Sequence, residues 1–254
     1  MTTPTTVAIG RARSGVVGGL IAFAVAAWFY IGLVASQMGD MSSVLAMPMT
    51  AAWTPAQSGL MVMMWAVMMA AMMLPSAVPM VLAYDRFDGA SGDVRGGSTV
   101  VFIAGYVLVW TVFAVLATGL QWTLHNMALV DGMGESTQSG LAGALLVGAG
   151  FFQFSPLKRR SLGACRTPMG FLMTEWQDGK AGALRMGIHH GLLCLGCCWA
   201  LMILLFVLGV MNLVWVVVLA VFVLAEKVSK RGEMISRAGG VVMIAWGVVA
   251  VLAG

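Results

Sequence analysis

Charged residues are scarce in this chain. Only 9% of its 254 residues are Asp, Glu, Lys or Arg, whereas 60% are hydrophobic and the mean hydropathy is +0.94. Soluble domains have about 25% charged residues, so this composition excludes a water-soluble globular fold and predicts an integral membrane protein. The sequence also lacks a basic patch interleaved with aromatic residues. We therefore expect no nucleic-acid partner, although the isoelectric point is about 9.1.

Long hydrophilic stretches are absent as well, and so are the alternating segments of roughly ten residues that form a transmembrane β-barrel. A helix needs about 20 apolar residues to cross the hydrocarbon core of a bilayer. Seven apolar segments meet or approach that length: 15–36, 58–84, 99–122, 139–155, 187–209, 211–225 and 238–253. We predict one all-α domain over residues 1–254, a polytopic bundle of about seven transmembrane helices in the lipid bilayer.

Positive charge is missing from alternate connecting segments. Short cytoplasmic loops collect Lys and Arg, whereas the segments 37–57, 123–138 and 211–212 contain neither. All fourteen lie in the other segments: Arg11, Arg13, Arg86, Arg95, Lys158, Arg159, Arg160, Arg166, Lys180, Arg185, Lys227, Lys230, Arg231 and Arg237. This asymmetry predicts a cytoplasmic N-terminal tail at 1–14 and a cytoplasmic loop at 156–186. We also predict that Glu226 and Lys227, at the end of an apolar segment, extend their side chains to the cytoplasmic membrane interface and anchor the helix there.

A cleaved signal peptide over residues 1–36 is the alternative at the N-terminus. Arg11 and Arg13 precede an apolar run that ends in Val34-Ala35-Ser36. The run has about 20 residues, whereas the apolar part of a cleaved signal has about 7–15. We therefore favour a retained first helix.

The segment 60–80 reads LMVMMWAVMMAAMMLPSAVPM and contains eight of the chain's 22 methionines. At about 100° per residue, Met64, Met68 and Met72 share one line along a helix, and Met69 and Met73 share a second. Such stripes are more often packing than chemistry, because Met is a flexible apolar residue that fills gaps. Here, however, Leu, Ile and Val are nearly absent from 61–73, so the thioethers are candidate ligands. Four further methionines, in the outer segment 37–57, are expected to collect a metal: Met38, Met41, Met47 and Met49.

The segment 187–202, GIHHGLLCLGCCWALM, contains two of the three histidines and three of the four cysteines. On a helix, one face over about two turns carries His190, Cys194, Cys197 and Cys198. Cysteines at this spacing bind a metal, form a redox pair or simply pack as small residues. Gly187, four residues before Gly191, has the spacing that lets another helix approach this face.

Both sulfur-rich segments are predicted to reach the middle of the bilayer, since each residue advances a helix by about 1.5 Å. Thioether and thiolate sulfur are soft donors that suit Cu(I) and are poor ligands for Mg²⁺, Ca²⁺ or Mn²⁺. One thiolate and one Cu(I) also sum to zero charge, and an unpaired ion in lipid costs several kcal/mol. Zinc, held by His190 and two or more cysteines, is the alternative. The candidate metal ligands are Met64, Met68, Met69, Met72, Met73, His190, Cys194, Cys197 and Cys198.

Four stretches of the sequence carry a family likeness: MWAVMMAAMMLPS (64–76), HHGLLCLGCCWALM (189–202), GVMNLVW (209–215) and EK (226–227). Together they resemble a bacterial and archaeal family of integral membrane proteins that are predicted to bind metal and whose function is unassigned. The resemblance covers most of the chain from about residue 58 onward. It implies a metal-binding protein of the bacterial cytoplasmic membrane. Because members of the family are often encoded beside another protein, it also implies a protein partner in the membrane or the periplasm.

These expectations favour a protein that binds Cu(I) for transport, storage or delivery. We predict no catalytic residue. A membrane thiol oxidoreductase that uses Cys194 and Cys197 as a dithiol is the enzymatic alternative. It leaves the methionines without a role, and thiols buried in lipid are weakly reactive. A third alternative is a scaffold subunit of a membrane complex, in which the sulfur serves only packing.

Overall fold

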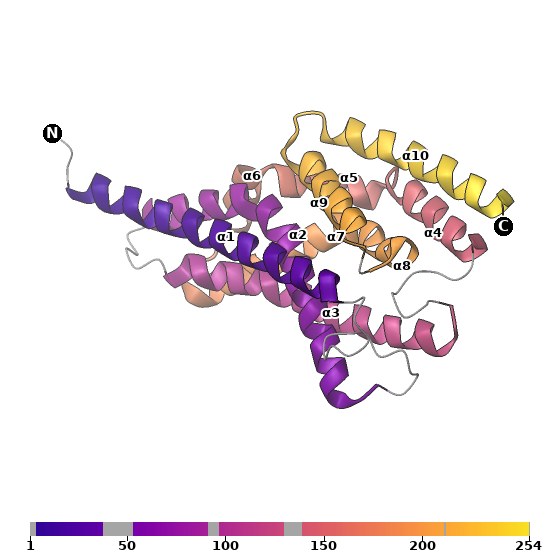
Figure 1. The fold of residues 1–254 in the computed structure, drawn as a ribbon. Helices are drawn as coiled ribbons and strands as arrows, with labels where there is room; N and C mark the ends of the chain where they lie inside the picture. Colours follow the sequence, from indigo (N-terminus) through magenta and orange to yellow (C-terminus); the bar gives the residue numbers. More distant parts are fainter. Residues whose placement is uncertain (1–3, 38–52, 91–96, 130–138, 211, 254) are drawn as a thin grey trace.

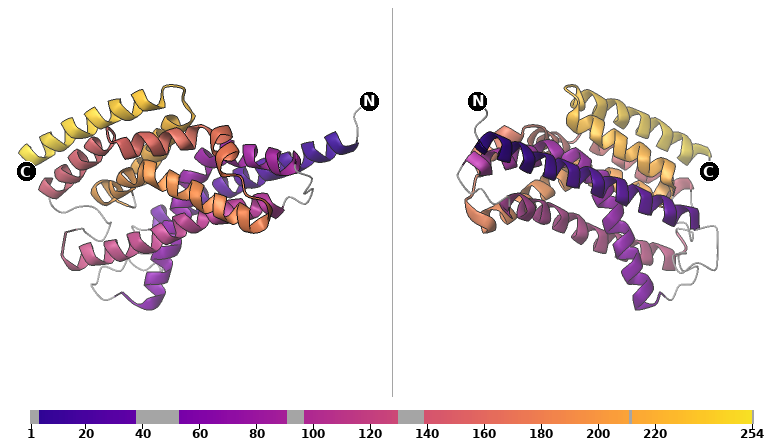
Figure 2. Two further views of the ribbon diagram at one scale, coloured as in Figure 1. Left: turned by 180° about the vertical axis from the view of Figure 1, so that it is seen from behind. Right: turned by 60° about the vertical axis from the view of Figure 1, so that its left-hand side comes forward.

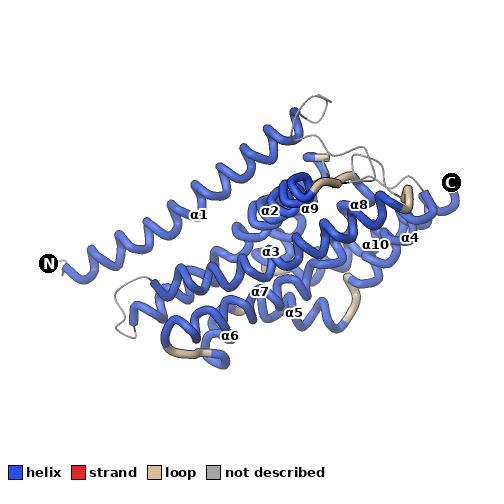
Figure 3. The backbone as a smooth tube through the Cα atoms, turned by 90° about the horizontal axis from the view of Figure 1, so that it is seen from below, coloured by secondary structure: helices blue, strands red, loops and turns tan. Residues whose placement is uncertain are grey.

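The structure is a computed structural model that describes residues 4–37, 53–90, 97–129, 139–210 and 212–253. These residues form helices, with no strand among them (Figure 3), so the predicted all-α fold is confirmed for this part of the chain. The helices are α1 (Pro4–Gln37), α2 (Pro55–Ala90), α3 (Gly97–Asn126), α4 (Ser139–Phe152), α5 (Pro156–Arg166), α6 (Pro168–Glu175), α7 (Gly179–Ile203), α8 (Leu205–Leu208), α9 (Leu213–Val228) and α10 (Gly232–Ala253).

Four segments of the described chain are long and apolar enough to cross a membrane: Pro55–Asp88, Gly97–Asn126, Gly179–Leu208 and Gly232–Leu252. A fifth is possible if α4 and α5, which meet at a bend of 61°, cross together. α9 has only 16 residues, fewer than the about 20 that a perpendicular span needs. Each of the seven predicted apolar segments falls largely on a described helix or on consecutive helices, but seven spans and a cytoplasmic N-terminus stay predictions.

The outermost helices expose large apolar side chains. α1 runs along one side of the molecule (Figure 3) and packs against α2. Phe29 of α1 is 68% exposed and Leu252 of α10 is 82% exposed. Apolar surface of this kind is unfavourable in water and favourable against lipid tails, so it is compatible with a membrane protein.

α2 occupies the centre of the bundle and packs against α1, α3 and α9. It begins with a reciprocal cap, in which the Thr54 N–H donates to Gln57 Oε1 at 2.9 Å and the Gln57 N–H donates to Thr54 Oγ1 at 3.3 Å. The helix continues through Pro75 and Pro79. The five methionines predicted as ligands are all buried: Met64, Met68, Met69, Met72 and Met73. The methionine column therefore faces protein, whereas Met63 on the same helix is 49% exposed.

α3 and α7 approach closely because glycines line their contact. A Cβ atom on Gly105 would lie 2.5 Å from the Leu184 carbonyl oxygen, and one on Gly187 would collide with the Phe102 carbonyl. The predicted approach of another helix at Gly187 is thus confirmed, and that helix is α3. The packing stacks the Tyr106 ring on His190, with ring centroids 5.6 Å apart.

α4 and α10 lie side by side at the opposite end of the molecule (Figures 1 and 2). After α4 the chain turns at Ser155, whose Oγ accepts a hydrogen bond from the Lys158 N–H at 3.1 Å, and Pro156 opens α5. The turn directs α5 onto α7. The segment 156–186, predicted as a connecting loop, therefore contains α5, α6 and the start of α7.

Candidate metal centre

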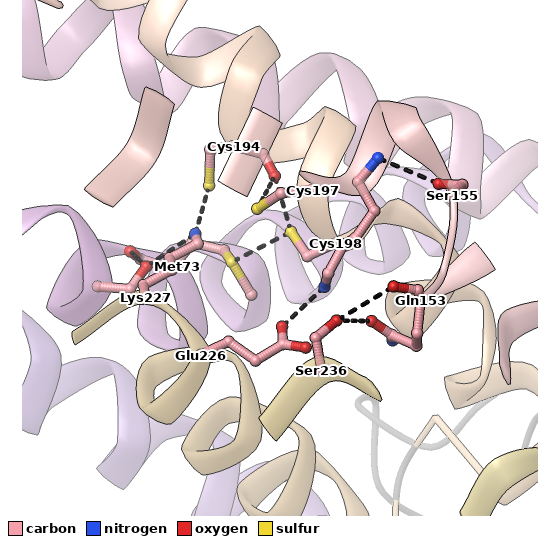
Figure 4. Close-up of polar contacts among 11 residues, drawn as sticks. Met73, Gln153, Ser155, Cys194, Cys197, Cys198, Glu226, Lys227 and Ser236 are labelled. Atoms are coloured by element: carbon pink, nitrogen blue, oxygen red, sulfur yellow. Dashed lines mark hydrogen bonds and ion pairs between the residues drawn. The ribbon is translucent and has the colours of Figure 1, made fainter. Parts of the chain in front are cut away.

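The two sulfur-rich helices meet at a contact between two sulfur atoms. Met73 Sδ of α2 lies 3.9 Å from Cys198 Sγ of α7, and both side chains are fully buried (Figure 4). Two sulfurs that bind one metal tetrahedrally at about 2.3 Å are about 3.8 Å apart. The observed separation therefore suits two ligands of one soft metal ion with little movement.

The three cysteines of α7 are gathered within one turn of this contact. Cys194, Cys197 and Cys198 are each at most 1% exposed. The thiols of Cys197 and Cys198 both donate to the Cys194 carbonyl oxygen at 3.0 Å. These bonds turn both side chains back along the helix, toward Cys194.

Tyr106 of α3 connects the two sulfur-bearing helices. Its hydroxyl lies 3.0 Å from Cys194 Sγ and donates to the Met73 carbonyl oxygen at 3.2 Å. The phenol therefore fixes the position of α2 relative to α7 at the level of the sulfurs. We did not predict this residue; Tyr is rare in the chain, with only three copies, and one in an apolar helix signals a polar partner.

Lys227 of α9 enters the same cluster. Its Nζ lies 2.8 Å from Cys194 Sγ and donates to Ser76 Oγ at 3.1 Å (Figure 4). Lys227 is only 8% exposed and Glu226 is fully buried, so the prediction that this pair anchors the chain at the membrane interface is wrong. An ammonium group in this place electrostatically favours a negative charge on the neighbouring sulfur.

The neighbouring residue on α9 forms a separate ion pair. Glu226 Oε2 lies 2.7 Å from Lys158 Nζ of α5, and both side chains are 1% exposed. Nearby, Ser236 of α10 donates to Gln153 Oε1 at 2.8 Å. The ion pair thus ties α5 to α9, and Lys158, which we assigned to the cytoplasmic loop, lies in the interior.

His190 is buried on α7, one helical turn before Cys194. It is 3% exposed, lies among the rings of Phe102, Tyr106 and Phe171, and has no hydrogen-bond partner for Nδ1 within the described residues. His189 points elsewhere, toward Glu175 at 3.4 Å. A role of His190 as a ligand remains a prediction.

The remaining predicted ligands of α2 are also buried: Met64, Met68, Met69 and Met72. The methionines of the outer segment, at positions 38–49, lie outside the described residues. Of the methionine column, the structure thus places Met73 against a thiol. The other four stay predicted members of the site.

A fourth cysteine, on α5, joins the cluster unexpectedly. Cys165 follows Ser161 by about one helical turn on α5, which packs against α7 where Gly196 precedes Cys197. Even so, no group of three or more His, Cys, Asp or Glu side chains in the described part of the chain is placed to hold a metal ion. A metal at this position would therefore need the Met73 thioether in addition to cysteine ligands.

Comparisons with known proteins add one finding. Residues 62–250, which are most of the chain, match the model of a family described as "PpoB2: Copper chaperone". No curated protein matches the chain, and no solved structure matches it.

Proposed function

Because the chain belongs to the PpoB2 family of copper chaperones, we propose that it binds Cu(I) as cargo at the Met73–Cys198 contact and holds the ion for delivery. The proposed ligands are the thiolates of Cys194 and Cys198 and the thioether of Met73. All three are soft donors, which Cu(I) prefers. The 3.9 Å separation of Met73 Sδ and Cys198 Sγ is the observation that carries this proposal.

Lys227 balances the charge of the proposed site. Two thiolates, one Cu(I) and one ammonium group sum to zero, and burial in a low-dielectric interior favours a neutral assembly. Without copper, the same ammonium group is neutralised by a single thiolate, for which Cys194 at 2.8 Å is the nearest candidate. Binding of one Cu(I) then releases one proton, and the net charge of the interior does not change.

The methionine column of α2 supplies a route to this site. Met64, Met68, Met69 and Met72 are buried along the helix that carries Met73, and neutral thioethers bind Cu(I) without adding charge. In the proposal, the methionines of segment 37–57 collect the ion outside a bacterial cytoplasmic membrane. A membrane or periplasmic protein then takes part as donor or acceptor of the copper.

Copper analysis of the purified protein tests the proposal. Wild-type protein loaded under reducing conditions is expected to retain one Cu(I) per chain. The variants Met73→Leu and Cys198→Ser are expected to lose most of it, because each removes one sulfur from the contact. Met63→Leu is the matched control, since this exposed methionine lies on the same helix and should keep full occupancy.

Two outcomes would contradict the proposal. Equal copper retention in wild type, Met73→Leu and Cys198→Ser would mean that the sulfur contact serves packing alone. If wild type retained zinc in place of copper, and Met73→Leu retained the same amount, the metal ligands would be His190 and the cysteines instead.

A further inference from the structure

The buried face of α5 carries polar residues. Lys158, Ser161, Leu162 and Cys165 follow the spacing i, i+3, i+4, i+7, which places them on one side of the helix. This side lies directly on α7, because a Cβ atom on Gly196 would be 2.9 Å from Ser161 Oγ. Cys165 is one helical turn beyond Ser161, and Cys197 follows Gly196. Close backbone packing of α5 on α7 thus brings Cys165 near Cys197.

Cys165 differs from the other three cysteines in its exposure. Cys194, Cys197 and Cys198 are closed off from solvent, whereas Cys165 is half-buried. Cys165 is therefore the least enclosed of the four cysteines.

A positively charged surface cavity lies next to the helical turn that carries Cys165. The next residue, Arg166, is held by a hydrogen bond from its guanidinium to the Ser229 carbonyl oxygen at 2.6 Å. It lines a surface cavity of about 580 Å³ together with Lys230, Arg231, Glu233, Met234 and Arg237. Four cations and one carboxylate leave this cavity net positive. A Cu(I) ion bound by two thiolates carries one negative charge. The positive charges of this cavity stabilise such a complex, as the Lys227 ammonium does at the buried site.

We propose that Cys165 is the exit ligand, through which Cu(I) passes from the buried site to the surface; this inference rests on the proposed function. In the step, the bonds from copper to Cys194, Cys198 and the neutral Met73 thioether break, and bonds to Cys197 and Cys165 form. The two thiol protons of Cys197 and Cys165 move to the two thiolate sulfurs that copper has left. No electron is transferred, copper remains Cu(I), and no further reactant is needed.

The test is the rate at which copper-loaded protein in detergent gives up Cu(I) to a water-soluble bicinchoninate chelator. Cys165→Ser is expected to retain one Cu(I) per chain, since the inner ligands are intact. Its release should slow by about tenfold or more, which corresponds to about 1.4 kcal/mol of added barrier. Ala164→Ser is the matched control, because it places a hydroxyl on the adjacent half-buried position of α5 and should release copper at the wild-type rate.

Alkylation provides a second measurement. In metal-free protein, a maleimide should modify Cys165 before the three buried cysteines, and loading with copper should slow this reaction. Release from Cys165→Ser at the wild-type rate would overturn the exit proposal alone. Loss of copper from Cys165→Ser would also overturn it, because Cys165 would then be a ligand of the inner site. Failure of wild type to retain copper would overturn the proposed function and the exit step together.

Discussion

Two buried lysines have different electrostatic surroundings, although Glu226, the partner of Lys158, directly precedes Lys227 on α9. Lys158 is paired with the Glu226 carboxylate at 2.7 Å. Lys227, the next residue along α9, is surrounded by the Cys194 sulfur, the Ser76 hydroxyl and the Tyr106–Met73 contact. The first cation has a countercharge in the protein that is independent of metal. The second depends on the ionisation of sulfur, and we infer that this dependence couples it to copper.

Loss of the Lys158–Glu226 pair and loss of the Lys227 charge are expected to have different consequences. The Lys158–Glu226 pair holds α5 against α9 and should matter for folding. Lys227 should matter for the affinity of the metal, because its removal leaves Cys194 able to stay a neutral thiol. The two regions are adjacent in the structure (Figure 4), so substitutions in them can be compared within one fold.

The largest expected effect is on stability, from Glu226→Gln. This change leaves the Lys158 ammonium buried without its countercharge, which typically costs about 3–5 kcal/mol. The melting temperature in detergent should fall accordingly. The double variant Lys158→Met, Glu226→Met should recover most of the loss, because it removes both charges together. A single variant that melts like wild type would show that this ion pair does not hold the bundle together.

A smaller effect, and one of a different kind, is expected from Lys227→Met. Copper affinity should fall by about 10–100-fold, as for other residues that support a metal ligand without binding the metal. The melting temperature of the metal-free protein should change less than in Glu226→Gln. Competition with a Cu(I) chelator measures the affinity, and Arg159→Met, at an exposed position of α5, is the control for loss of a positive charge at the surface. Unchanged copper affinity in Lys227→Met would remove the distinction between the two lysines.

The smallest effect is expected from Tyr106→Phe. The variant loses the hydroxyl contact with Cys194 and the hydrogen bond to the Met73 carbonyl, while the ring remains stacked on His190. A net loss of about 1 kcal/mol in the free energy of unfolding is expected. Copper affinity should shift in the same direction by less than in Lys227→Met. A larger loss of affinity than in that variant would mean that the hydroxyl, and not the ammonium, stabilises the sulfur charge.

Sequence reasoning anticipated the helical fold and the segments that carry the sulfur. Helical spacing and equal depth meant that the two sulfur-rich segments could meet if their helices were neighbours, and the structure brings Met73 to Cys198. Periodicity describes one helix at a time, so it could not identify which methionine makes the contact. It also could not place Tyr106, whose partners come from two other helices.

Our prediction that Glu226 and Lys227 lie at the membrane interface was wrong for a physical reason. A Glu-Lys pair at the end of an apolar helix is normally exposed, since burial of each charge requires a partner from elsewhere in the fold. Here Lys158 and Cys194 are those partners, and both are remote in sequence. We did not predict α5 as a helix that packs in the interior. The side of α5 that faces α7 consists of Lys158, Ser161 and Cys165 beside one leucine, so it has no apolar pattern.

X-ray absorption at the copper K-edge of the loaded protein tests the central claim most directly. We predict a Cu(I) edge and a first coordination shell of sulfur alone, with one sulfur fewer in Met73→Leu and an unchanged shell in Met63→Leu. A first shell of nitrogen and oxygen, or a sulfur shell identical in wild type and Met73→Leu, would contradict the claim that α2 and α7 bind the same copper ion.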